Sequence, residues 1–404
     1  MPTAALDVDR LRADTPGSAR VNHLNNAGSA LPPSIVVDTM VEHLRLEEEI
    51  GGYEAHAAAQ AQIDAVYPSV AALLHSRPDQ ISLVESATSA WDRGFAALVH
   101  SGQIPAGSRI LISGAEYASN VIPAMQMARH HQAVVEVIPS DAAGLVDVNA
   151  LAGMLNSSVA AVLINHCPSQ NGLINDAAAI GAAIRASGSG AWYVLDACQS
   201  VGQLEVDAPA IGADFLSATG RKFLRGPRGT GFLYSSDRAL TELEPFPLDL
   251  HGATWIPGGY EVATGGRRYE SWEKSYAAIL GMGAAIDYAL ACGMPLLRER
   301  ISALAEYART GLAALPGIVV RDGGATAAER SGIVTITHDH MPAAELAPAI
   351  KARGVNVSLS TPDYSRDAFD AAGISGLVRI SPHAYNTQAE IDSLIDIVAE
   401  LTAY

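Results

Sequence analysis

The sequence predicts an α/β fold, and two patterns lead to this prediction. From residue 80 onward, short apolar runs alternate with alanine-rich amphipathic stretches, as strands alternate with helices in α/β proteins. The runs are apolar at consecutive positions, which is typical of parallel strands buried on both faces. The chain has 404 residues, of which 49% are hydrophobic, enough for one large domain and a smaller one.

Six apolar runs up to residue 219 are expected to be strands, and a seventh follows them. They cover residues 80–86, 109–114, 134–139, 160–165, 191–197, 213–219 and 229–236. Helices are expected between them. One example is 176–187, which has Asn175 and Asp176 at its start and Gly188 just past its end, as the ends of helices often do.

The pattern changes after about residue 270, where a helix is followed by two apolar runs, 332–339 and 378–385. A last helix is expected to begin after Thr387, which has Glu390 in capping-box spacing. We therefore predict a large domain of mostly parallel mixed sheet over 21–270. A smaller α+β C-terminal domain is predicted over 271–404, with residues 1–20 able to pack on it.

The charge of the chain limits the partners that it can have. With 26 Lys and Arg against 43 Asp and Glu, the net charge is −17, which repels nucleic acid and anionic membrane surfaces. No apolar run has the length of a spanning helix and the first twenty residues lack a signal-peptide core, so a cytoplasmic location is expected. Three scattered cysteines favour neither a disulfide framework nor a metal site.

Asp196 and Lys222 are the first candidates for chemistry. Asp196 ends an expected strand, and Lys222 follows the next strand, so both are expected in the ligand crevice at the carboxyl edge of the sheet. A carboxylate and a lysine in one crevice suit a pyridinium cofactor, since the acid keeps the ring nitrogen protonated and the amine forms a Schiff base. A buried ion pair or two unrelated surface charges are the alternatives.

Seven segments, in order along the chain, carry a resemblance to one family. They are HLNNAGSALPP (23–33), SATSAWDRGF (86–95), GAEYASNVIP (114–123), HCPSQNGLIN (166–175), LDACQSVGQLEVD (195–207), SATGRKFLRGPRGTGFLY (217–234) and VRISPHAYNTQAEID (378–392). Over about residues 21–400 the chain resembles the class-V aminotransferases, fold-type I enzymes that use pyridoxal 5'-phosphate. This family holds cysteine desulfurases, selenocysteine lyases, isopenicillin-epimerase-like proteins and ergothioneine-pathway C–S lyases.

The resemblance implies roles around the cofactor ring. Lys222 would form the Schiff base, Asp196 would pair with the pyridine nitrogen, and Gln199 would lie near the phenolic oxygen. Tyr117 would stack over the ring where many relatives carry a histidine, unless it is a core tyrosine. Cys198, two residues beyond Asp196 on the expected strand, would point the same way and pack under the ring, a role compatible with a small buried hydrophobe.

The cofactor phosphate needs hydrogen-bond donors, and these are expected at a helix start. Ala87, Thr88 and Ser89 lie between an expected strand and an expected helix, and Thr88 could equally be the N-cap. Thr219 and Arg221 match the Ser and His phosphate contacts of the family. Arginine in place of histidine keeps the interaction, because a guanidinium binds phosphate in a bidentate manner.

Substrate contacts follow from the same resemblance. Arg379 would bind the α-carboxylate of an amino-acid substrate, and its alternative is a salt bridge at the end of a strand. Ser169 stands where desulfurases have an asparagine beside the cofactor. Tyr53, in a segment that resembles the epimerase-like and C–S lyase branches, is a candidate for the substrate pocket.

Two departures from the family pattern narrow the reaction. Desulfurases present a nucleophilic cysteine on the loop that corresponds to 354–369, and this segment contains no cysteine. Trp272 and Glu273 replace a glycine and a threonine that reaches the phosphate bound by the partner subunit. The resemblance implies a homodimer, and these replacements leave that phosphate contact open.

The favoured function is a cysteine-desulfurase-like C–S lyase that binds its substrate as a Schiff base and eliminates a β-substituent, without a persulfide cysteine. An aminotransferase or an amino-acid epimerase is the alternative, because the same residues serve all three reactions. A non-catalytic regulator that binds the cofactor is the remote alternative. It is disfavoured because no helix-turn-helix or basic arm is present and the charge is unsuited to DNA.

Overall fold

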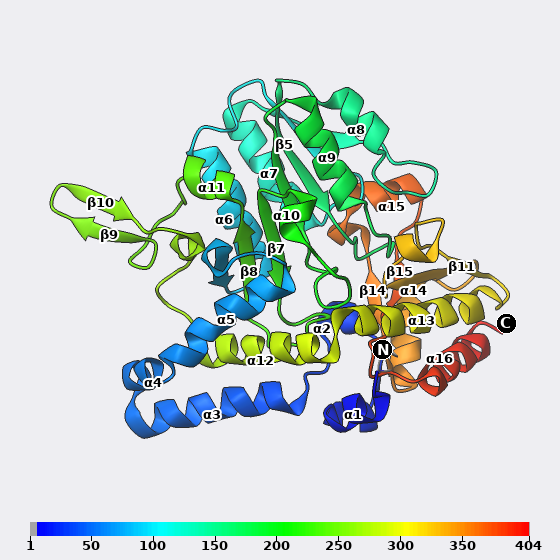
Figure 1. Cartoon of the computed structure of the whole chain (residues 1–404). Coiled ribbons are helices and arrows are strands. Elements are labelled where there is room, and N and C mark those ends of the chain that lie inside the picture. The colour runs from blue at the N-terminus through cyan, green and yellow to red at the C-terminus, as the bar shows by residue number, and fades with distance from the viewer. Residues whose placement is uncertain (1–5, 404) are drawn as a thin grey trace, which may run out of the picture.

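A computed structural model gives the fold of the chain and describes residues 6–403. A seven-stranded mixed sheet forms its centre, in the order β2-β8-β7-β6-β5-β3-β4 (Figure 1). Its strands are β2 (Ile81–Val84), β3 (Arg109–Ser113), β4 (Val134–Ile138), β5 (Val159–Asn165), β6 (Trp192–Asp196), β7 (Phe215–Thr219) and β8 (Gly231–Ser235). All neighbouring strands pair in parallel except at β8, which is antiparallel to both β7 and β2. The expected α/β fold with a mostly parallel sheet is confirmed.

Helices cover both faces of this sheet because successive strand residues point to opposite sides. On β5, Val162 and Ile164 join one apolar cluster, whereas Ala161 and Leu163 join the other. The first face is covered by α5 (Gln60–Leu73), α8 (Val148–Met154), α9 (Ala177–Ser187), α10 (Ala208–Ile211) and α12 (Tyr276–Cys292). The second is covered by α6 (Ala87–His100), α7 (Ala118–His131) and α11 (Asp237–Glu242).

One part of the strand prediction is wrong. Val134 and Val137 of β4 are 51% and 46% exposed, although burial on both faces was expected. β4 is the last strand at one edge of the sheet, so the helices cover it less completely than the central strands. The helix prediction is confirmed at α9, which begins after the N-cap Asp176 and ends before Gly188 in the left-handed conformation.

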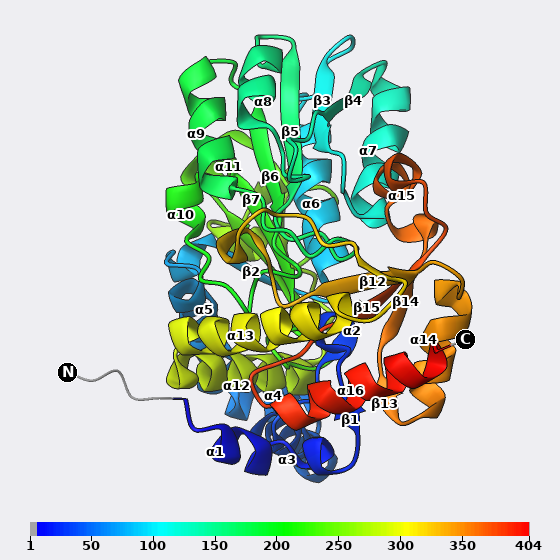
Figure 2. The same cartoon turned by 90° about the vertical axis from the view of Figure 1, so that its right-hand side faces the viewer.

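A second sheet forms from the C-terminal part of the chain, in the order β11-β12-β15-β14 (Figure 2). Its strands are β11 (Ile318–Val320), β12 (Val334–His338), β14 (Ser358–Ser360) and β15 (Leu377–Ile380). Around it lie α13 (Met294–Ala313), α14 (Ala343–Ala352), α15 (Arg366–Ala372) and α16 (Gln388–Leu401). The predicted capping box of Thr387 and Glu390 opens α16. The domain boundary at residue 270 stays a prediction.

The N-terminal segment contacts both parts of the molecule. In α1 (Val8–Ala13), Arg12 pairs with Glu390 of α16 at 3.0 Å, whereas Asp14, just after α1, accepts a hydrogen bond from Tyr288 of α12. β1 (Asn22–His23) pairs in parallel with β13 (Val355–Asn356). Residues 1–5, part of the segment expected to pack on the small domain, lie outside the described residues.

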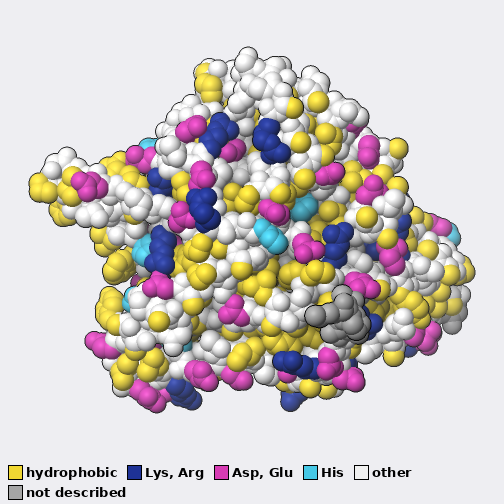
Figure 3. Space-filling view, viewed as in Figure 1, with side chains coloured by type: hydrophobic (Ala, Val, Ile, Leu, Met, Phe, Trp, Pro, Cys, Tyr) yellow, Lys and Arg dark blue, Asp and Glu magenta, His cyan; other side chains and the backbone are white. Residues whose placement is uncertain are grey.

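A hairpin that sequence patterns did not reveal projects from the large sheet (Figure 1). It consists of β9 (Ala253–Ile256) and β10 (Gly259–Val262), and Trp255 on it is 87% exposed. Hydrophobic side chains lie at its tip and base in Figure 3. The remaining helices, α2 (Asn26–Ser29), α3 (Ser34–Ile50) and α4 (Gly52–Ala58), lie in the N-terminal part. Within residues 6–403 no single helix is long and apolar enough to cross a membrane, although the bent pair α12 and α13 together meets those two criteria.

Candidate active site

The carboxyl ends of three parallel strands meet at one cavity. Asp196 is the last residue of β6, Asn165 is the last residue of β5, and the two are partners in the strand register. Thr219 ends β7, and Lys222 lies in the turn that follows. Fourteen residues line the cavity: Ser86, Ala87, Thr88, Tyr117, Ser119, Asn120, Asn165, Ser169, Asp196, Cys198, Gln199, Thr219, Arg221 and Lys222. The structure thus brings most of the expected site residues together.

Lys222 stands apart from the other lysines. The chain has only three, and Lys274 is tied to the fully buried carboxylate of Glu270, while Lys351 is exposed on α14. Lys222 lies in the cavity with Asp196, and no ion pair joins the two among the residues described. The alternative of a buried Asp–Lys ion pair is therefore wrong.

Two donors hold the Asp196 carboxylate in place. The backbone N–H of Cys198 donates to Oδ1 at 2.8 Å, and Asn120 Nδ2 on α7 donates to Oδ2 at 2.9 Å. Cys198 is in the cavity as expected. The predicted reason, that it continues the strand two residues beyond Asp196, is wrong. β6 ends at Asp196 and the chain turns, so Cys198 is not on a strand. Burial raises the pKa of its thiol, and the neighbouring Lys222 partly offsets that effect.

A second buried carboxylate lies behind Asp196. Glu116 accepts hydrogen bonds from Ser113 Oγ at 2.9 Å and from Asn120 Nδ2 at 3.0 Å. Burial, with the negative charge of Asp196 as the next cause, raises the pKa of Glu116 to about 7. Asn120 therefore bridges two acids with one amide group, and this bridge fixes the orientation of Asp196.

The start of α6 lies at one end of the cavity, and helix starts carry N–H donors suited to an anion. Its N-cap is Ser86, whose side chain accepts from Ser89 N at 3.0 Å, so Thr88 is not the N-cap. Ala87 and Thr88 line the cavity, where first-turn N–H groups have no partner within their helix. Ser89, which was expected to contact the phosphate, is not among the lining residues, and its backbone N–H is used by the cap.

Thr219 and Arg221 flank this helix start. Thr219 Oγ1 donates to the backbone oxygen of Thr230 at 3.0 Å, and Arg221 donates through Nη1 to the backbone oxygen of Gly28. No carboxylate within residues 6–403 pairs with Arg221. Its positive charge is therefore free to attract an anion at this end of the cavity.

Gln199 and Ser169 complete the lining on other sides. Gln199 Nε2 donates to the backbone oxygen of Ala27 at 3.1 Å, whereas its Oε1 is buried without a partner among the described atoms. Ser169 Oγ donates to Gln170 Oε1 at 3.3 Å. The unpaired oxygen of Gln199 marks a place where a polar ligand group can bind.

Arg379 of β15 is buried and lies near Tyr117 and Arg221. Its Nη2 donates to Asn25 Oδ1 at 3.4 Å, its Nε has no partner in the part of the chain described, and burial lowers its pKa to about 10. No Asp or Glu within residues 6–403 pairs with it, so the salt-bridge alternative is wrong. A buried, unpaired guanidinium is suited to bind a carboxylate.

Tyr364 was not among the predicted residues. Its ring lies 6.2 Å from that of Tyr117 with an angle of 12° between the planes. The next residue, Ser365, is buried and accepts a hydrogen bond from Gln170 Nε2 at 2.7 Å. Tyr364, which follows β14 of the small sheet, thus faces Tyr117, the residue that is expected to cover the cofactor ring.

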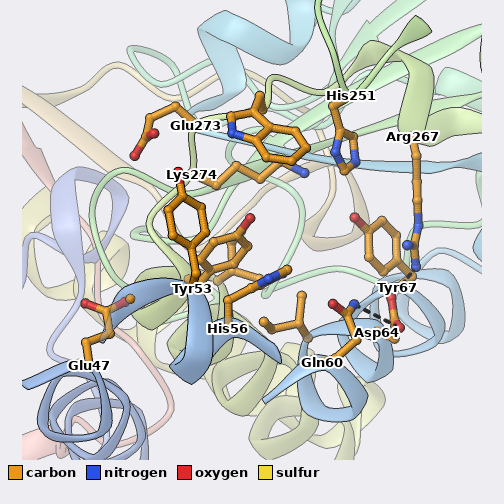
Figure 4. A pocket seen from close by; sticks show the side chains of 15 residues that line it. Glu47, Tyr53, His56, Gln60, Asp64, Tyr67, His251, Arg267, Glu273 and Lys274 are labelled. Atoms are coloured by element: carbon orange, nitrogen blue, oxygen red, sulfur yellow. Dashed lines mark hydrogen bonds and ion pairs between the residues drawn. The ribbon is translucent and has the colours of Figure 1, made fainter. Parts of the chain in front are cut away.

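Tyr53 is not brought into this cavity. It lies on α4 and lines a second cavity with Trp272 and Glu273 (Figure 4). The two cavities share no lining residue. Within one chain the structure therefore separates Tyr53 from Lys222.

These features define the class of protein: an α/β enzyme with a lysine and an acid at the carboxyl edge of a mixed sheet. The family model "Aminotransferase class-V" matches residues 22–394, and the chain belongs to this family. Enzymes of this family use pyridoxal phosphate. The family and the cofactor predicted from the sequence are confirmed.

Several relatives agree with this assignment. A probable cysteine desulfurase of Methanothermobacter thermautotrophicus is 27% identical over 403 residues, covering 97% of each chain. The apo structure of a cysteine desulfurase from Thermococcus onnurineus NA1 matches with a TM-score of 0.90 at 22% identity and covers 100% of each chain. The cystine C–S lyase C-DES, solved with its product cysteine persulfide, matches with a TM-score of 0.85 at 20% identity, covering 96% of this chain and 99% of its own. The structural matches show a shared fold.

The residues of the Lys222 cavity fit pyridoxal phosphate. An acid held by two donors faces the cavity, a helix start and an unpaired guanidinium stand at the anion end, and the buried Gln199 Oε1 lacks a partner in the described structure. Asp196 offers an acceptor for a protonated ring nitrogen. The start of α6 and Arg221 offer donors for a phosphate, and Gln199 Oε1 offers an acceptor for a hydroxyl.

Proposed function

We propose that this chain is a pyridoxal-phosphate-dependent C–S lyase, which eliminates a sulfur-bearing β-substituent from an amino acid. The observation that carries the proposal is the absence of a thiol where desulfurases need one. The side chain of the 354–369 segment that faces Tyr117 belongs to Tyr364, not to a cysteine. The proposal rests on the family, the residues of the Lys222 cavity and this replacement.

The residues of the cavity divide into those that hold the cofactor and those that act. Asp196 would keep the ring nitrogen protonated, Tyr117 would cover the ring, and Gln199, Cys198 and Ser169 would line the rest of the site. The phosphate would be held by the first-turn N–H groups of α6 (Ala87 and Thr88), by Thr219 and by Arg221. When bound, pyridoxal phosphate supplies an electron sink that makes the α-proton of an attached amino acid acidic.

The remaining residues act on the substrate. Arg379 binds the α-carboxylate and so orients the amino acid, because its buried guanidinium has no acidic partner in residues 6–403. Lys222 would hold the cofactor, and once an amino acid is bound its Nζ would be the base that accepts the α-proton. Loss of that proton is the step that allows the β-substituent to leave.

None of the three cysteines lies in the 354–369 segment, where desulfurases carry theirs. Cys167 is fully buried, and burial raises the pKa of its thiol to about 12. Cys198 lines the Lys222 cavity, whereas Cys292 ends α12 and lines a different cavity with Asp7 and Tyr288. A thiol with a raised pKa is a poor nucleophile at neutral pH.

The experiment is a substrate panel with three proteins. Wild type, Lys222→Ala and a variant with all three cysteines replaced by serine are incubated with cysteine, cystine and cysteine conjugates. We expect pyruvate, ammonia and the sulfur product in a 1:1:1 ratio from wild type. The cysteine-free variant should form the same three products and keep most of the turnover, and Lys222→Ala should form none. An oxo acid that keeps the whole substrate skeleton, or activity lost in Cys167→Ala with a trappable protein persulfide, would contradict the proposal.

We also infer that the protein is a cytoplasmic homodimer. On α3, Val37, Val41 and Leu44 recur at helical spacing and are 45%, 48% and 51% exposed, an apolar stripe that one chain leaves uncovered. Trp272 is likewise 52% exposed. A second copy on this surface would bring Trp272 and Glu273 toward the phosphate end of the other site.

A further inference from the structure

One buried amide group connects the segments that carry Tyr117 and Tyr364. Gln170 Nε2 donates to the backbone oxygen of Ala115 at 2.9 Å and to Ser365 Oγ at 2.7 Å, so both of its hydrogens are used. Ala115 lies two residues before Tyr117, and Ser365 directly follows Tyr364. Gln170 and Ser365 are both buried. The amide therefore fixes the loop after β14 against the start of α7, where Tyr117 lies.

Local hydrogen bonds also fix the backbone at Tyr364. The loop forms a single helical turn, Pro362–Tyr364, and the proline at its start has a restricted φ angle. The N–H groups of Tyr364 and Ser365 donate to the backbone oxygens of Thr361 and Pro362, each at 3.1 Å. This turn packs against α7. The position of the Tyr364 backbone is therefore set on both sides, although the side chain is 45% exposed.

The Tyr117 side chain depends on packing for its orientation. No hydrogen bond from Tyr117 Oη is found within residues 6–403. Its backbone is set because Tyr117 is the N-cap of α7, but the rotation of the side chain is left to its neighbours. Tyr364 provides a nearly parallel ring at 6.2 Å, within the separation range of stacked aromatic pairs. Tyr117 lines the Lys222 cavity and Tyr364 does not, so Tyr364 supports the Tyr117 ring from outside the cavity.

We propose that Tyr364 is a positioning residue for Tyr117, and that Gln170 holds the two rings in register. A stacked ring limits Tyr117 to one orientation, so the cofactor ring meets a cover that needs no reordering on binding. The role given to Tyr364 rests on the proposed role of Tyr117 and not on the type of reaction. All contacts that define it lie within one chain, so they do not depend on how a second copy docks.

The test measures cofactor binding by the purified protein in its native assembly. Equilibrium dialysis gives the dissociation constant of pyridoxal phosphate, and visible circular dichroism reports how firmly the bound ring is oriented. Tyr364→Leu removes the ring and keeps an apolar side chain. It should weaken binding about threefold to tenfold, the range that one stacked aromatic pair accounts for, and it should reduce the dichroism band. Tyr364→Phe keeps the ring and should behave as wild type in both measurements.

Two more tyrosine variants separate the possible outcomes. Tyr307→Leu, at an exposed position on α13, is the matched control and should change neither measurement. Tyr117→Leu should weaken cofactor binding at least as much as Tyr364→Leu. An effect of Tyr117→Leu without one of Tyr364→Leu, or an equal loss in Tyr364→Phe and Tyr364→Leu, would overturn the role of the Tyr364 ring. No effect of either leucine variant would overturn the roles of both tyrosines and leave the C–S lyase proposal to its own test.

Gln170→Ala tests the connection between the two segments. It should weaken cofactor binding about threefold in wild type, but less than about twofold when Tyr364→Leu is already present, because residues that act through one contact are not additive. Ser365→Ala removes one of the two acceptors and replaces Gln170→Ala in this comparison if that variant does not fold. Gln126→Ala, at an exposed position on α7, is the control. Equal effects in both backgrounds would mean that Gln170 does not act through Tyr364.

Discussion

Asn120 Nδ2 donates to Asp196 over 2.9 Å and to Glu116 over 3.0 Å, so one amide group joins two buried carboxylates. Both of its hydrogens are used, which leaves the amide a single orientation. Asp196 is in turn fixed between Asn120 and the N–H of Cys198. The direction in which Asp196 presents its charge to the cavity is therefore set by α7 as well as by β6.

Asn120→Ala should weaken binding of pyridoxal phosphate about tenfold to a hundredfold. Removing the amide leaves two buried carboxylates without a shared donor, a loss of about 1–3 kcal/mol. Equilibrium dialysis of the variant measures the dissociation constant directly. Asn149→Ala, at an exposed position on α8, is the control and should bind the cofactor as wild type does. Equal affinity in Asn120→Ala and wild type would mean that Asp196 is held without the bridge.

Glu116 should make the stability depend on pH in a direction opposite to that of most acids. The pKa of the folded carboxyl is about 7 against an ordinary 4.5, so between these values the folded protein keeps a proton that the unfolded chain loses. The contribution of the Glu116 carboxyl to the free energy of unfolding is fully present below pH 4.5 and is lost as the pH rises toward 7. The stability advantage of wild type over Glu116→Gln should therefore shrink over this interval, as measured by thermal unfolding. An advantage that grows with pH would contradict the raised pKa.

Arg379→Ala should damage substrate binding and leave the cofactor in place. Loss of one charge-assisted contact to the carboxylate costs about 2–3 kcal/mol, or about thirtyfold to more than a hundredfold in kcat/KM. The absorption of the bound cofactor should not change, which serves as the internal control. An unchanged kcat/KM would place the carboxylate site elsewhere.

The apolar stripe on α3 should be covered in solution. Light scattering is expected to give the mass of a dimer, or of a tetramer built from dimers, for wild type. Val41→Glu together with Leu44→Glu should shift the protein toward monomer, because two charges then enter an apolar contact. Ile122→Glu, at an exposed apolar position on α7, is the matched control. A fully active wild-type monomer would contradict the proposed assembly.

The large sheet could be predicted because its strands are continuous apolar runs with capped helices between them. Asp196 and Lys222 were found by one rule, that ligands bind at the carboxyl ends of parallel strands. The same rule applied to β5 indicates Asn165, the register partner of Asp196, which was missed. The hairpin of β9 and β10 has exposed strands without a buried face, so it gives no periodic signal.

The contacts that cross between distant segments could not be predicted. In the 114–123 segment only Tyr117 was given a role from the sequence, although Glu116 and Asn120 lie beside it. Only the fold shows that Asn120 reaches Asp196, 76 residues away. Tyr364 faces Tyr117 because the loop after β14 is tied through Ser365 to Gln170. Tyr53 was assigned to the substrate pocket by resemblance, whereas within one chain it lines the second cavity.

The central claim is that Lys222 carries the cofactor, and one measurement tests it most directly. The purified protein is reduced with borohydride and digested, and its peptides are analysed by mass spectrometry. With only three lysines in the chain, the modified position is unambiguous. We predict one reduced pyridoxyl phosphate group on Lys222 and none on Lys274 or Lys351. A modification on Lys274, or no modified lysine in protein that binds the cofactor, would contradict the account.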